Sequence, residues 1–315
     1  MQLHSIEAAG NYDPRILRQI WMLARRVDPH VMHTWLPQMD VAAGAVALSR
    51  HLPWVVAERS SADAYVRRYR DRVLRRVLGS RADAVIANSR AGAEFWEGAL
   101  LDGARAHVVR NALPLAAISA SQPAALDSLG LARAGQPVVV FVGRLAPEKN
   151  IGLLLSVATE VCDRLDAVFL ICGEGPLRRE MERRLRESKS GDTKLLGDRA
   201  DIWPLMKAAN AFVSTSAFEG QPNAVLEAMA CGCPLVVSDI PAHREFLDDR
   251  TAQLVALTQE EFVRAILRAL ERRPDIVDRK RAAQERAEQY DVNSAALAYE
   301  MIYHEAALRR DRCVE

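Results

Sequence analysis

The sequence lacks the features that mark membrane, secreted and metal-binding proteins. No apolar run reaches the ~18 residues that a membrane-spanning helix needs, and the first residues do not form the basic and apolar pattern of a secretory signal. The five cysteines are odd in number and lack metal-ligand spacing, and Cys231 and Cys233 are one residue too close for a C-x-x-C redox pair. The net charge of +1 gives no special attraction to nucleic acid. We therefore expect a cytoplasmic protein with reduced, mostly buried thiols and no nucleic-acid partner.

The sequence does contain short apolar runs that alternate with longer amphipathic ones. This rhythm is typical of a parallel sheet covered by helices on both faces. A length of 315 residues, half of them hydrophobic, fits two domains better than one. The apolar runs predict strands at 31–34, 54–57, 84–87 and 107–109, and then at 138–142, 167–172, 193–196, 211–214 and 235–237. Helices are expected at 40–49 and 64–78, from about residues 151, 176, 201, 222 and 259 onward, and at 293–310.

The expected fold class is α/β, with two Rossmann-like domains built on parallel sheets. We expect the first domain at 1–122, the second at 123–290, and a C-terminal helix at 291–315 that packs back toward the first domain. A polar connector at 123–135 opens the second domain. The first domain is expected to be incomplete, because only about 110 residues precede the connector and a full nucleotide-type domain has more strands.

Two glutamates, Glu219 and Glu227, stand with seven residues between them, and a Gly-Gln-Pro turn follows the first. Pro222 suits the first position of a helix, where its missing N–H costs nothing. The N–H groups of residues 223–225 would then be free to bind a phosphate. One carboxylate can face a sugar hydroxyl and the other a ribose hydroxyl, although carboxylates at this spacing are also common on solvated helices.

The loop at residues 143–150 follows a strongly apolar predicted strand. Gly143 permits a tight turn and close approach by a ligand. Arg144 and Lys149 can converge from the two sides of the loop, and such a cation pair suits a diphosphate that gains negative charge as it leaves. Two solvated surface charges are the alternative interpretation.

Together these segments resemble the retaining GT-B glycosyltransferases of family 4, also called group 1. The resemblance covers about residues 30–310 and is strongest at 138–241. It implies a GT-B-like fold and transfer of a sugar from a UDP- or GDP-linked donor to an acceptor hydroxyl, without a metal or other cofactor. It also implies catalytic roles for Glu219, Arg144 and Lys149, and a ribose contact for Glu227. The other implied donor-binding residues are Gly143, Gly173, Arg199, Gly220, Asn223, Ala224 and Val225.

Two of these loops are less specific. The turn from Gly173 to Pro176 lacks the third glycine of a dinucleotide fingerprint, which argues against an NAD-dependent dehydrogenase. It fits either a plain strand-to-helix turn or the similar turn that lines the nucleotide pocket in the family. The loop that holds Arg199 fits either a plain loop or the base-contacting loop of the family.

The acceptor side has weaker markers. Many family members have H-x-H at the end of the strand that corresponds to the first one predicted in this chain, at 31–34. This chain has His33 and Trp35 at these two histidine positions. The simpler interpretation of His33 is an ordinary strand-end histidine. Arg59 lies in Glu58-Arg59-Ser60, which resembles a family loop, as do residues 87–89 and 110–111. On this basis His33, Trp35 and Arg59 are expected on the acceptor side.

Six arginines between residues 67 and 76 lie on a helical pattern. Its expected apolar stripe consists of Val66, Tyr69, Val73 and Val77. Such a helix could touch an anionic membrane surface that holds a lipid-linked acceptor. The simpler interpretation is that the arginines form a solvated helix face.

The resemblance implies a role in the synthesis of cell-envelope polysaccharide, lipopolysaccharide or glycolipid, either in the cytoplasm or peripherally at the inner face of the membrane. Its partners would be a nucleotide sugar and a glycan or lipid-linked acceptor. Family members usually have a further strand and a Gly-rich loop before the segment seen here, so we expect an upstream start or a naturally shortened protein. The alternative function is a non-catalytic sugar-nucleotide-binding subunit of an envelope assembly. A shortened sheet would leave an exposed edge, which predicts weak activity and self-association.

Overall fold

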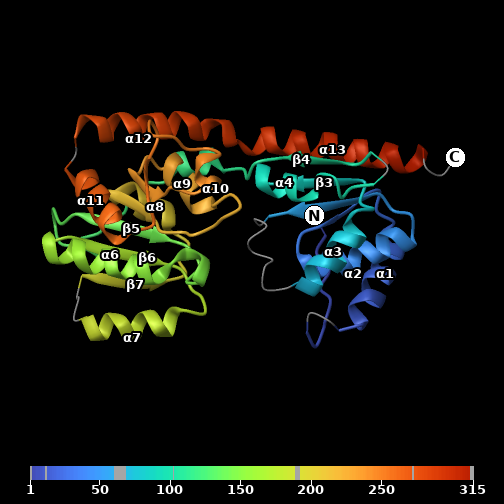
Figure 1. The fold of residues 1–315 in the computed structure, drawn as a ribbon, viewed down its shortest axis with the longest axis horizontal. Helices are drawn as coiled ribbons and strands as arrows, with labels where there is room; N and C mark the ends of the chain where they lie inside the picture. The colour runs from blue at the N-terminus through green and yellow to red at the C-terminus, as the bar shows by residue number, and fades with distance from the viewer. Residues whose placement is uncertain are drawn as a thin grey trace. The chain divides into compact units, whose positions relative to one another are not determined.

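The computed structural model describes residues 2–10, 13–59, 69–101, 103–188, 192–271 and 273–312 (Figure 1). Contacts between residues divide the chain into two compact units. Unit 1 consists of Met1–Asn111 together with Asn293–Glu315, and unit 2 consists of Ala112–Val292. The two ends of the chain thus belong to one unit, and the boundary after Asn111 comes before the one expected at residue 122.

Unit 1 is built on a four-stranded parallel sheet with the order β1-β2-β3-β4. A parallel α/β architecture is therefore confirmed for this part of the chain. The strands are β1 (Met32–Thr34), β2 (Trp54–Glu58), β3 (Ala84–Ala87) and β4 (Arg105–Val108). The helices among the described residues are α1 (Arg15–Val27), α2 (Pro37–Ser49), α3 (Tyr69–Gly79), α4 (Arg90–Trp96) and α13 (Val292–Arg312); α1 and α4 were not predicted from the sequence.

The strand order determines how this sheet is covered. Parallel crossovers are right-handed in nearly all proteins, so strands added in sequence order place α2, α3 and α4 on the same face. Successive side chains of a strand point to opposite faces. Trp54 and Val85 accordingly pack with the residues of the crossover helices, whereas Val55 and Ile86 point to the other face. That second face is covered by Ile302 and its neighbours on α13, the last helix of the chain (Figure 1).

Helix α3 has a different rotation from the predicted one. Val73 and Val77, expected in an apolar stripe, are 42% and 53% exposed, whereas Arg75 is buried. The Arg75 guanidinium donates to Asp40 of α2 at 2.5 Å and to Glu58 of β2 at 2.7 Å. An unpaired charge at this depth would cost about 3–5 kcal/mol, so the two carboxylates select the helix face that turns inward. Residues 60–68, with part of the predicted basic helix, and the side chains of 69–72 lie outside the described part of the chain.

Unit 2 is built on a six-stranded parallel sheet with the order β10-β9-β8-β5-β6-β7. The direction in which strands are added reverses between β5 and β8, and ligands of open α/β sheets bind at the carboxyl ends of the strands at such a switch point. The strands are β5 (Val138–Val142), β6 (Val168–Cys172), β7 (Thr193–Gly197), β8 (Ala211–Ser214), β9 (Leu235–Ser238) and β10 (Gln253–Val255). The helices are α5 (Leu115–Ala120), α6 (Ile151–Arg164), α7 (Arg178–Ser188), α8 (Ile202–Ala208), α9 (Asn223–Ala230), α10 (Pro241–Arg244), α11 (Gln259–Leu270) and α12 (Pro274–Ala287).

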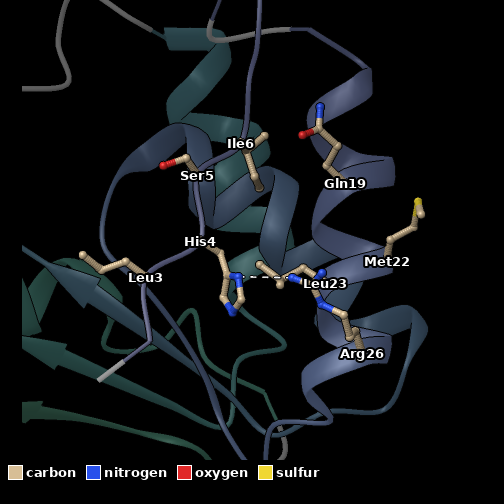
Figure 2. Close-up of a pocket in the computed structure, with 8 residues that line it drawn as sticks. All are labelled: Leu3, His4, Ser5, Ile6, Gln19, Met22, Leu23 and Arg26. Atoms are coloured by element: carbon tan, nitrogen blue, oxygen red, sulfur yellow. Dashed lines mark hydrogen bonds between the residues drawn. The ribbon is translucent and has the colours of Figure 1, made fainter.

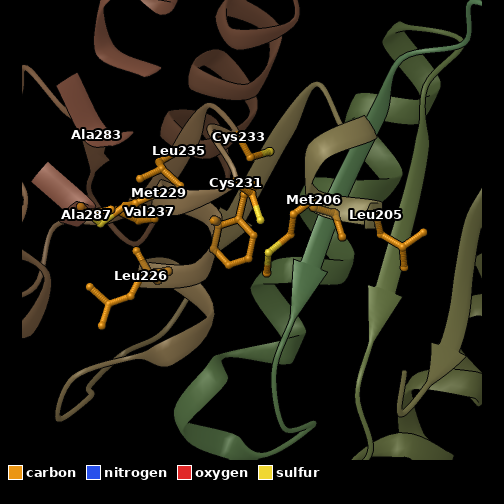
Figure 3. Close-up of a cluster of buried hydrophobic side chains, with 14 of the residues drawn as sticks. Leu205, Met206, Leu226, Met229, Cys231, Cys233, Leu235, Val237, Ala283 and Ala287 are labelled. Atoms are coloured by element: carbon orange, nitrogen blue, oxygen red, sulfur yellow. The ribbon is translucent and has the colours of Figure 1, made fainter. Parts of the chain in front are cut away.

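Helix α9 is held by a buried cluster on one face of this sheet (Figure 3). Leu226 and Met229 of α9 pack with Val237 of β9, and Ala283 and Ala287 of α12 cover them from the other side. The sequence did not predict α12, yet this helix closes the core around α9. This packing therefore holds the start of α9 in place at the carboxyl edge of the sheet.

The described cysteines are free thiols. Cys172, Cys231 and Cys233 are buried and Cys162 is partly exposed, as the sequence predicted, while Cys313 lies outside the described residues. Burial raises the pKa of the Cys172 thiol to about 11, which keeps it protonated near neutral pH. Within the described ranges, none of the helices combines the length and apolar character that a bilayer-spanning segment needs.

Candidate functional site

Two loops that hold predicted donor residues meet at the switch point of the unit 2 sheet. One loop follows β5 and includes a short 3-10 helix at Pro147–Lys149, and the other follows β8 and leads to α9. The Thr215 hydroxyl donates to the Lys149 carbonyl oxygen at 2.8 Å, and the Ala217 N–H donates to the Glu148 carbonyl oxygen at 2.8 Å. These bonds tie the two loops together and bring residues about 70 positions apart into contact.

Lys149 and Glu219 form an ion pair at this point. The Lys149 Nζ contacts Oε1 of Glu219, and both side chains are largely buried, at 16% and 12% exposure. The Ser216 hydroxyl also donates to Oε1 of Glu219, at 2.6 Å. Among the described residues Oε2 of Glu219 has no recorded partner, so one oxygen is anchored and the other can accept a hydrogen bond from a ligand hydroxyl.

A buried polar chain behind Glu219 was not predicted from the sequence. Nδ1 of His243 lies 2.7 Å from the Ser238 carbonyl oxygen, which can only accept, so this nitrogen carries the proton. The Ser238 hydroxyl donates to the Ser216 carbonyl oxygen at 2.6 Å. Burial lowers the pKa of His243 below its usual value, so the imidazole is neutral. The chain fixes the backbone of Ser216 and through it the side chain that holds Glu219.

The glycines at the ends of β5 and β6 have a packing reason. Gly173 has φ of +136°, and a Cβ there would lie 2.0 Å from the Gly143 carbonyl oxygen. The Gly143 N–H in turn donates to the Cys172 carbonyl oxygen at 3.0 Å. Close backbone contact between neighbouring loops therefore requires Gly173, whichever of the two interpretations of this turn applies.

The Arg144 guanidinium and the Lys149 ammonium group do not share a partner. The Arg144 guanidinium pairs with Glu148, four residues further on, and 67% of its side chain is exposed. The structure thus gives the two predicted cations different partners, Glu148 for Arg144 and Glu219 for Lys149. Convergence of both cations on one diphosphate would require Arg144 to leave its present partner, and it stays a prediction.

The start of α9 differs in one respect from the prediction. Pro222 is the residue before the helix, which begins at Asn223. The Val225 N–H, expected to be free, donates to the Pro222 carbonyl oxygen at 3.2 Å. A tight first turn explains the difference, because a carbonyl three residues back takes up one of the N–H groups of a helix start. Asn223 is exposed and Ala224 is half-buried at this end, next to Gly220 in the turn before the helix.

Glu227 lies half-buried on α9, apart from the Lys149–Glu219 pair. Its Oε1 accepts a hydrogen bond from Nε1 of Trp203 on α8 at 3.2 Å, a contact that the sequence did not suggest. Burial raises the pKa of Glu227 above its usual value, and the Trp203 bond offsets part of this shift. Arg199 donates two bonds to Asp201, at 2.7 and 2.5 Å, so its guanidinium is occupied within its own loop.

The three residues predicted for the acceptor side lie together at the carboxyl edge of the unit 1 sheet. The His33 and Trp35 ring centroids are 5.0 Å apart, and the Arg59 guanidinium carbon lies 4.3 Å from the Trp35 ring centroid. Two residues of α13 join them: the Tyr303 hydroxyl is 2.8 Å from Nδ1 of His33, and the Tyr299 ring is 6° from parallel to Trp35. Burial, with a smaller effect of the Arg59 charge, lowers the pKa of His33 to about 4.

The other predicted family loops of unit 1 have structural roles. Glu58 is fully buried and also accepts from Nε1 of Trp96 at 3.1 Å. The Ser89 hydroxyl caps α4 by accepting from the Gly92 N–H at 3.1 Å. Ser60 lies outside the described residues. Of these loops, Arg59 and its partner Asn111 remain candidates for ligand contact, with Nη1 of Arg59 2.6 Å from Oδ1 of Asn111.

A pocket of about 380 Å³ lies between the N-terminal segment and α1, and none of the predicted site residues lines it (Figure 2). Arg26 reaches Nδ1 of His4 across it at 3.1 Å. Its remaining lining residues are Leu3, Ser5, Ile6, Gln19, Met22 and Leu23. Within the described ranges, no three His, Cys, Asp or Glu side chains are grouped closely enough to hold a metal ion.

Two protein-family models match the chain. Residues 136–272 match the family described as glycosyl transferases group 1, and residues 2–117 match the family described as glycosyltransferase family 4. Each match falls almost entirely within one of the two α/β units.

Curated relatives resemble part of the chain. It is 32% identical over 162 residues to a GDP-mannose-dependent α-(1-6)-phosphatidylinositol dimannoside mannosyltransferase of Mycobacterium tuberculosis, a match of 51% of this chain and 42% of the relative. It is 37% identical over 117 residues to an Escherichia coli UDP-Gal:α-D-GlcNAc-diphosphoundecaprenol α-1,3-galactosyltransferase, a match of 36% of this chain and 30% of the relative. The matched segments thus span less than half the length of these relatives.

Solved structures resemble nearly the whole chain in fold. The crystal structure of Alr3699/HepE of Anabaena with UDP-glucose has a TM-score of 0.78 at 20% identity, and covers 97% of this chain and 84% of that one. A sucrose-phosphate synthase from Thermosynechococcus elongatus has a TM-score of 0.78 at 19% identity, and covers 93% and 77%. At these identities the likeness concerns the fold.

Proposed function

The chain belongs to the group 1 glycosyltransferases, which have the GT-B fold, and we propose that it transfers a sugar from a nucleotide diphosphate sugar to an acceptor hydroxyl. We further propose that the anomeric configuration is retained and that the donor is UDP- or GDP-linked. Relatives and structural neighbours that use GDP-mannose or bind UDP-glucose support this choice of donor.

The observation that carries the proposal is the Lys149–Glu219 pair at the switch point of the unit 2 sheet. A cation and an anchored carboxylate meet where ligands of such sheets bind. In the proposed reaction the bond between the anomeric carbon and the diphosphate oxygen breaks, and its electron pair stays with the diphosphate. The acceptor hydroxyl oxygen forms the new bond to that carbon, and the hydroxyl proton passes to the departing diphosphate. Lys149 would stabilise the growing charge on the diphosphate, while the free oxygen of Glu219 would orient the donor sugar.

The remaining donor roles follow from position. Arg144 would exchange Glu148 for the diphosphate, since an exposed ion pair is worth little in water. Glu227 would accept from the ribose hydroxyls, because its second oxygen has no recorded partner among the described residues. Ala224 at the start of α9 would contribute its N–H group to the diphosphate. Gly143 and Gly173 would line the same edge.

The proposed product is an envelope polysaccharide or glycolipid, since the names of two relatives specify phosphatidylinositol-linked and diphosphoundecaprenol-linked acceptors. We propose peripheral contact with an anionic membrane for the same reason. Helix α1 supports it better than the predicted α3 face: Trp21 and Met22 are 40% and 54% exposed, and the helix carries four arginines and no acidic residue. Cosedimentation with phosphatidylglycerol vesicles, compared with phosphatidylcholine vesicles, tests this contact.

The donor proposal is tested by calorimetry with UDP and GDP, and by following release of nucleotide from their sugar conjugates. We expect one nucleotide to bind and Lys149→Ala to weaken it, whereas Lys280→Ala, an exposed lysine of α12, should not. Failure of both nucleotides to bind would contradict the proposal. Tight binding with no release of nucleotide from any sugar conjugate would favour a sugar-nucleotide-binding subunit instead.

A further inference from the structure

The carboxyl edge of the unit 1 sheet holds an aromatic and cationic cluster whose cation has no carboxylate partner among the described residues. It consists of His33, Trp35, Arg59, Tyr299 and Tyr303. The tyrosines lie four residues apart on α13, so they share one face of that helix. The cluster is assembled from three separate segments of the chain, after β1, after β2 and on the last helix.

The rings in this cluster make a surface suited to a sugar. Trp35 is 46% exposed, and the Tyr299 ring is nearly parallel to it with a centroid separation of 6.4 Å. The face of an aromatic ring is electron-rich, and the C–H groups on one side of a pyranose ring are slightly positive, so the two pack favourably.

Arg59 adds an uncompensated positive charge. The buried Arg75 of the same unit has two carboxylate partners, and Arg199 of unit 2 has one. In contrast, Arg59 is half-buried, donates one hydrogen bond to Asn111, and has no carboxylate partner among the described residues. His33 does not add to the charge near neutral pH, since burial keeps it unprotonated. A half-buried guanidinium with unused N–H groups is suited to a phosphate or a carboxylate.

Two buried polar atoms in this region also lack hydrogen-bond partners in the protein. They are Nε2 of His33 and Oδ1 of Asn88, which follows β3. A buried polar group without a partner costs free energy, and native proteins rarely leave such groups unexplained. Both atoms lie at the carboxyl ends of strands of the unit 1 sheet, on the same edge as the cluster.

We infer that this cluster binds a sugar ring that carries a phosphate or a carboxylate group, with the ring on Trp35 and Tyr299 and the anion on Arg59. If the chain transfers sugar as proposed above, this ligand is part of the acceptor, so the acceptor role rests on that proposal. The binding itself does not, and it can be measured without any donor.

The experiment measures binding to the full chain by calorimetry and ligand-observed NMR. The probes are methyl α-glucoside, glucose 6-phosphate, glucuronate and inorganic phosphate. We expect glucose 6-phosphate or glucuronate to bind at least tenfold more tightly than both methyl α-glucoside and inorganic phosphate. The better of the two identifies the anion as phosphate or carboxylate. Equal affinities for charged and neutral sugars would overturn the inference.

Substitutions in the cluster test whether the charged sugar binds there. Arg59→Gln should reduce the preference for the charged sugar to within about threefold of the neutral one, and Trp35→Ala should weaken both. Tyr299→Phe should bind as the wild type, whereas Tyr299→Ala should lose at least fivefold. Unchanged binding in both Trp35→Ala and Tyr299→Ala would overturn the inference.

A matched pair elsewhere in unit 1 provides the control. Trp21 has the Arg50 guanidinium carbon 5.6 Å from its ring centroid, the same chemistry at a different place. Trp21→Ala and Arg50→Gln should leave binding of the charged sugar unchanged. Circular dichroism of each variant excludes loss of fold as the cause of a lost signal.

Failure of the inference can be distinguished from failure of the proposed function. Lys149→Ala should weaken nucleotide binding and leave binding of the charged sugar unchanged. Arg59→Gln should weaken binding of the charged sugar and leave nucleotide binding unchanged. If Lys149→Ala abolishes both, the sugar phosphate is entering the donor site and the inference is wrong. If no nucleotide binds but the charged sugar still depends on Arg59, the donor proposal fails and the inference stands.

Discussion

The two units use the same strand–helix repeat and differ in strand order. In unit 2 the order reverses between β5 and β8, so crossover helices cover both faces of the sheet and a switch point forms at the reversal. In unit 1 the four strands are added in one direction, so the crossover helices cover one face and the other is left to α13. Strand order therefore decides both where a ligand can bind and which segments a unit needs for its core.

The difference also appears in the two sites. The donor candidates of unit 2 are brought together by neighbouring loops of one sheet, with Lys149 and Glu219 at the reversal. The cluster of unit 1 needs a helix from the other end of the sequence, because Tyr299 and Tyr303 come from α13. The donor candidates of unit 2 thus depend on the topology of one sheet, whereas the cluster of unit 1 depends on the packing of a C-terminal helix against that unit.

The largest expected effect is on unit 1 when α13 is removed. A chain that ends at residue 292 would expose the face that carries Val55 and Ile86, so we expect β2 and β3 to lose protection from hydrogen exchange. The strands of unit 2 should keep theirs. Ile302→Ala should destabilise unit 1 by about 2–5 kcal/mol, because it leaves a cavity against the sheet. Met301→Ala, at 72% exposure on the same helix, is the matched control; equal protection of both sheets in the shortened chain would contradict the comparison.

The buried ion pairs of unit 1 are the next test. Arg75→Ala should cost about 3–5 kcal/mol, because it leaves Asp40 and Glu58 buried without their cation. Denaturant unfolding measures the loss, with the exposed Arg81→Ala as control. Adding Asp40→Asn and Glu58→Gln to Arg75→Ala should recover part of the stability, and no recovery would show that lost packing of the arginine is the main effect.

The two predicted cations of unit 2 should differ in effect. Lys149→Ala should cost about 2–3 kcal/mol in nucleotide binding, or about 30- to 150-fold, because a largely buried charge is lost. Arg144→Ala should cost at most about 1 kcal/mol, or about fivefold, because its side chain is exposed and paired with Glu148. Calorimetry with the nucleotide that binds provides the measurement. A larger loss in Arg144→Ala would mean that ligand binding rearranges this loop.

The two glutamates should separate binding from turnover. Glu227→Ala should weaken free nucleotide and nucleotide sugar alike, by about 1.5 kcal/mol or roughly tenfold. Glu219→Ala should spare free nucleotide and reduce turnover. Because burial raises the pKa of Glu227, the folded chain loses stability where this carboxyl group is ionised, at pH values above that pKa. Glu227→Gln should therefore be more stable than the wild type near neutral pH. Equal loss of nucleotide affinity in both alanine variants would contradict the assigned roles.

The last expected effect is a pH dependence in unit 1. His33 has a pKa of about 4 in the folded chain against 6.5 in an unfolded one, so the unfolded state binds the extra proton between these values. Stability should therefore fall as the pH drops from 6.5 to 4, by at most about 1.4 kcal/mol per pH unit from this group. The decline should be shallower in His33→Gln than in His304→Gln, an exposed histidine of α13. Identical slopes in the two variants would show that His33 does not titrate as described.

The elements that the sequence predicted well are those with a local signal. Strands β3, β5 and β8 are short, mainly apolar runs and have the predicted bounds, whereas β10 was not predicted. Helices without such a signal were missed, among them α12, which closes the core around α9. The predicted rotation of α3 was wrong because a hydrophobic pattern assigns arginine to solvent. Such a pattern contains no information that Asp40 and Glu58 would be buried beside Arg75.

The sequence alone determined the α/β class, the parallel sheets and the loops that hold Lys149 and Glu219, because strand periodicity and turn residues are properties of neighbouring positions. Only the tertiary structure decided the contacts made across the chain. These are the pairing of Glu219 with Lys149, the buried His243 chain, the Trp203 contact of Glu227, and the tyrosines of α13 beside Trp35. The reason is topological: strand order and crossover handedness place residues up to 270 positions apart side by side, and no periodicity in the sequence carries that information.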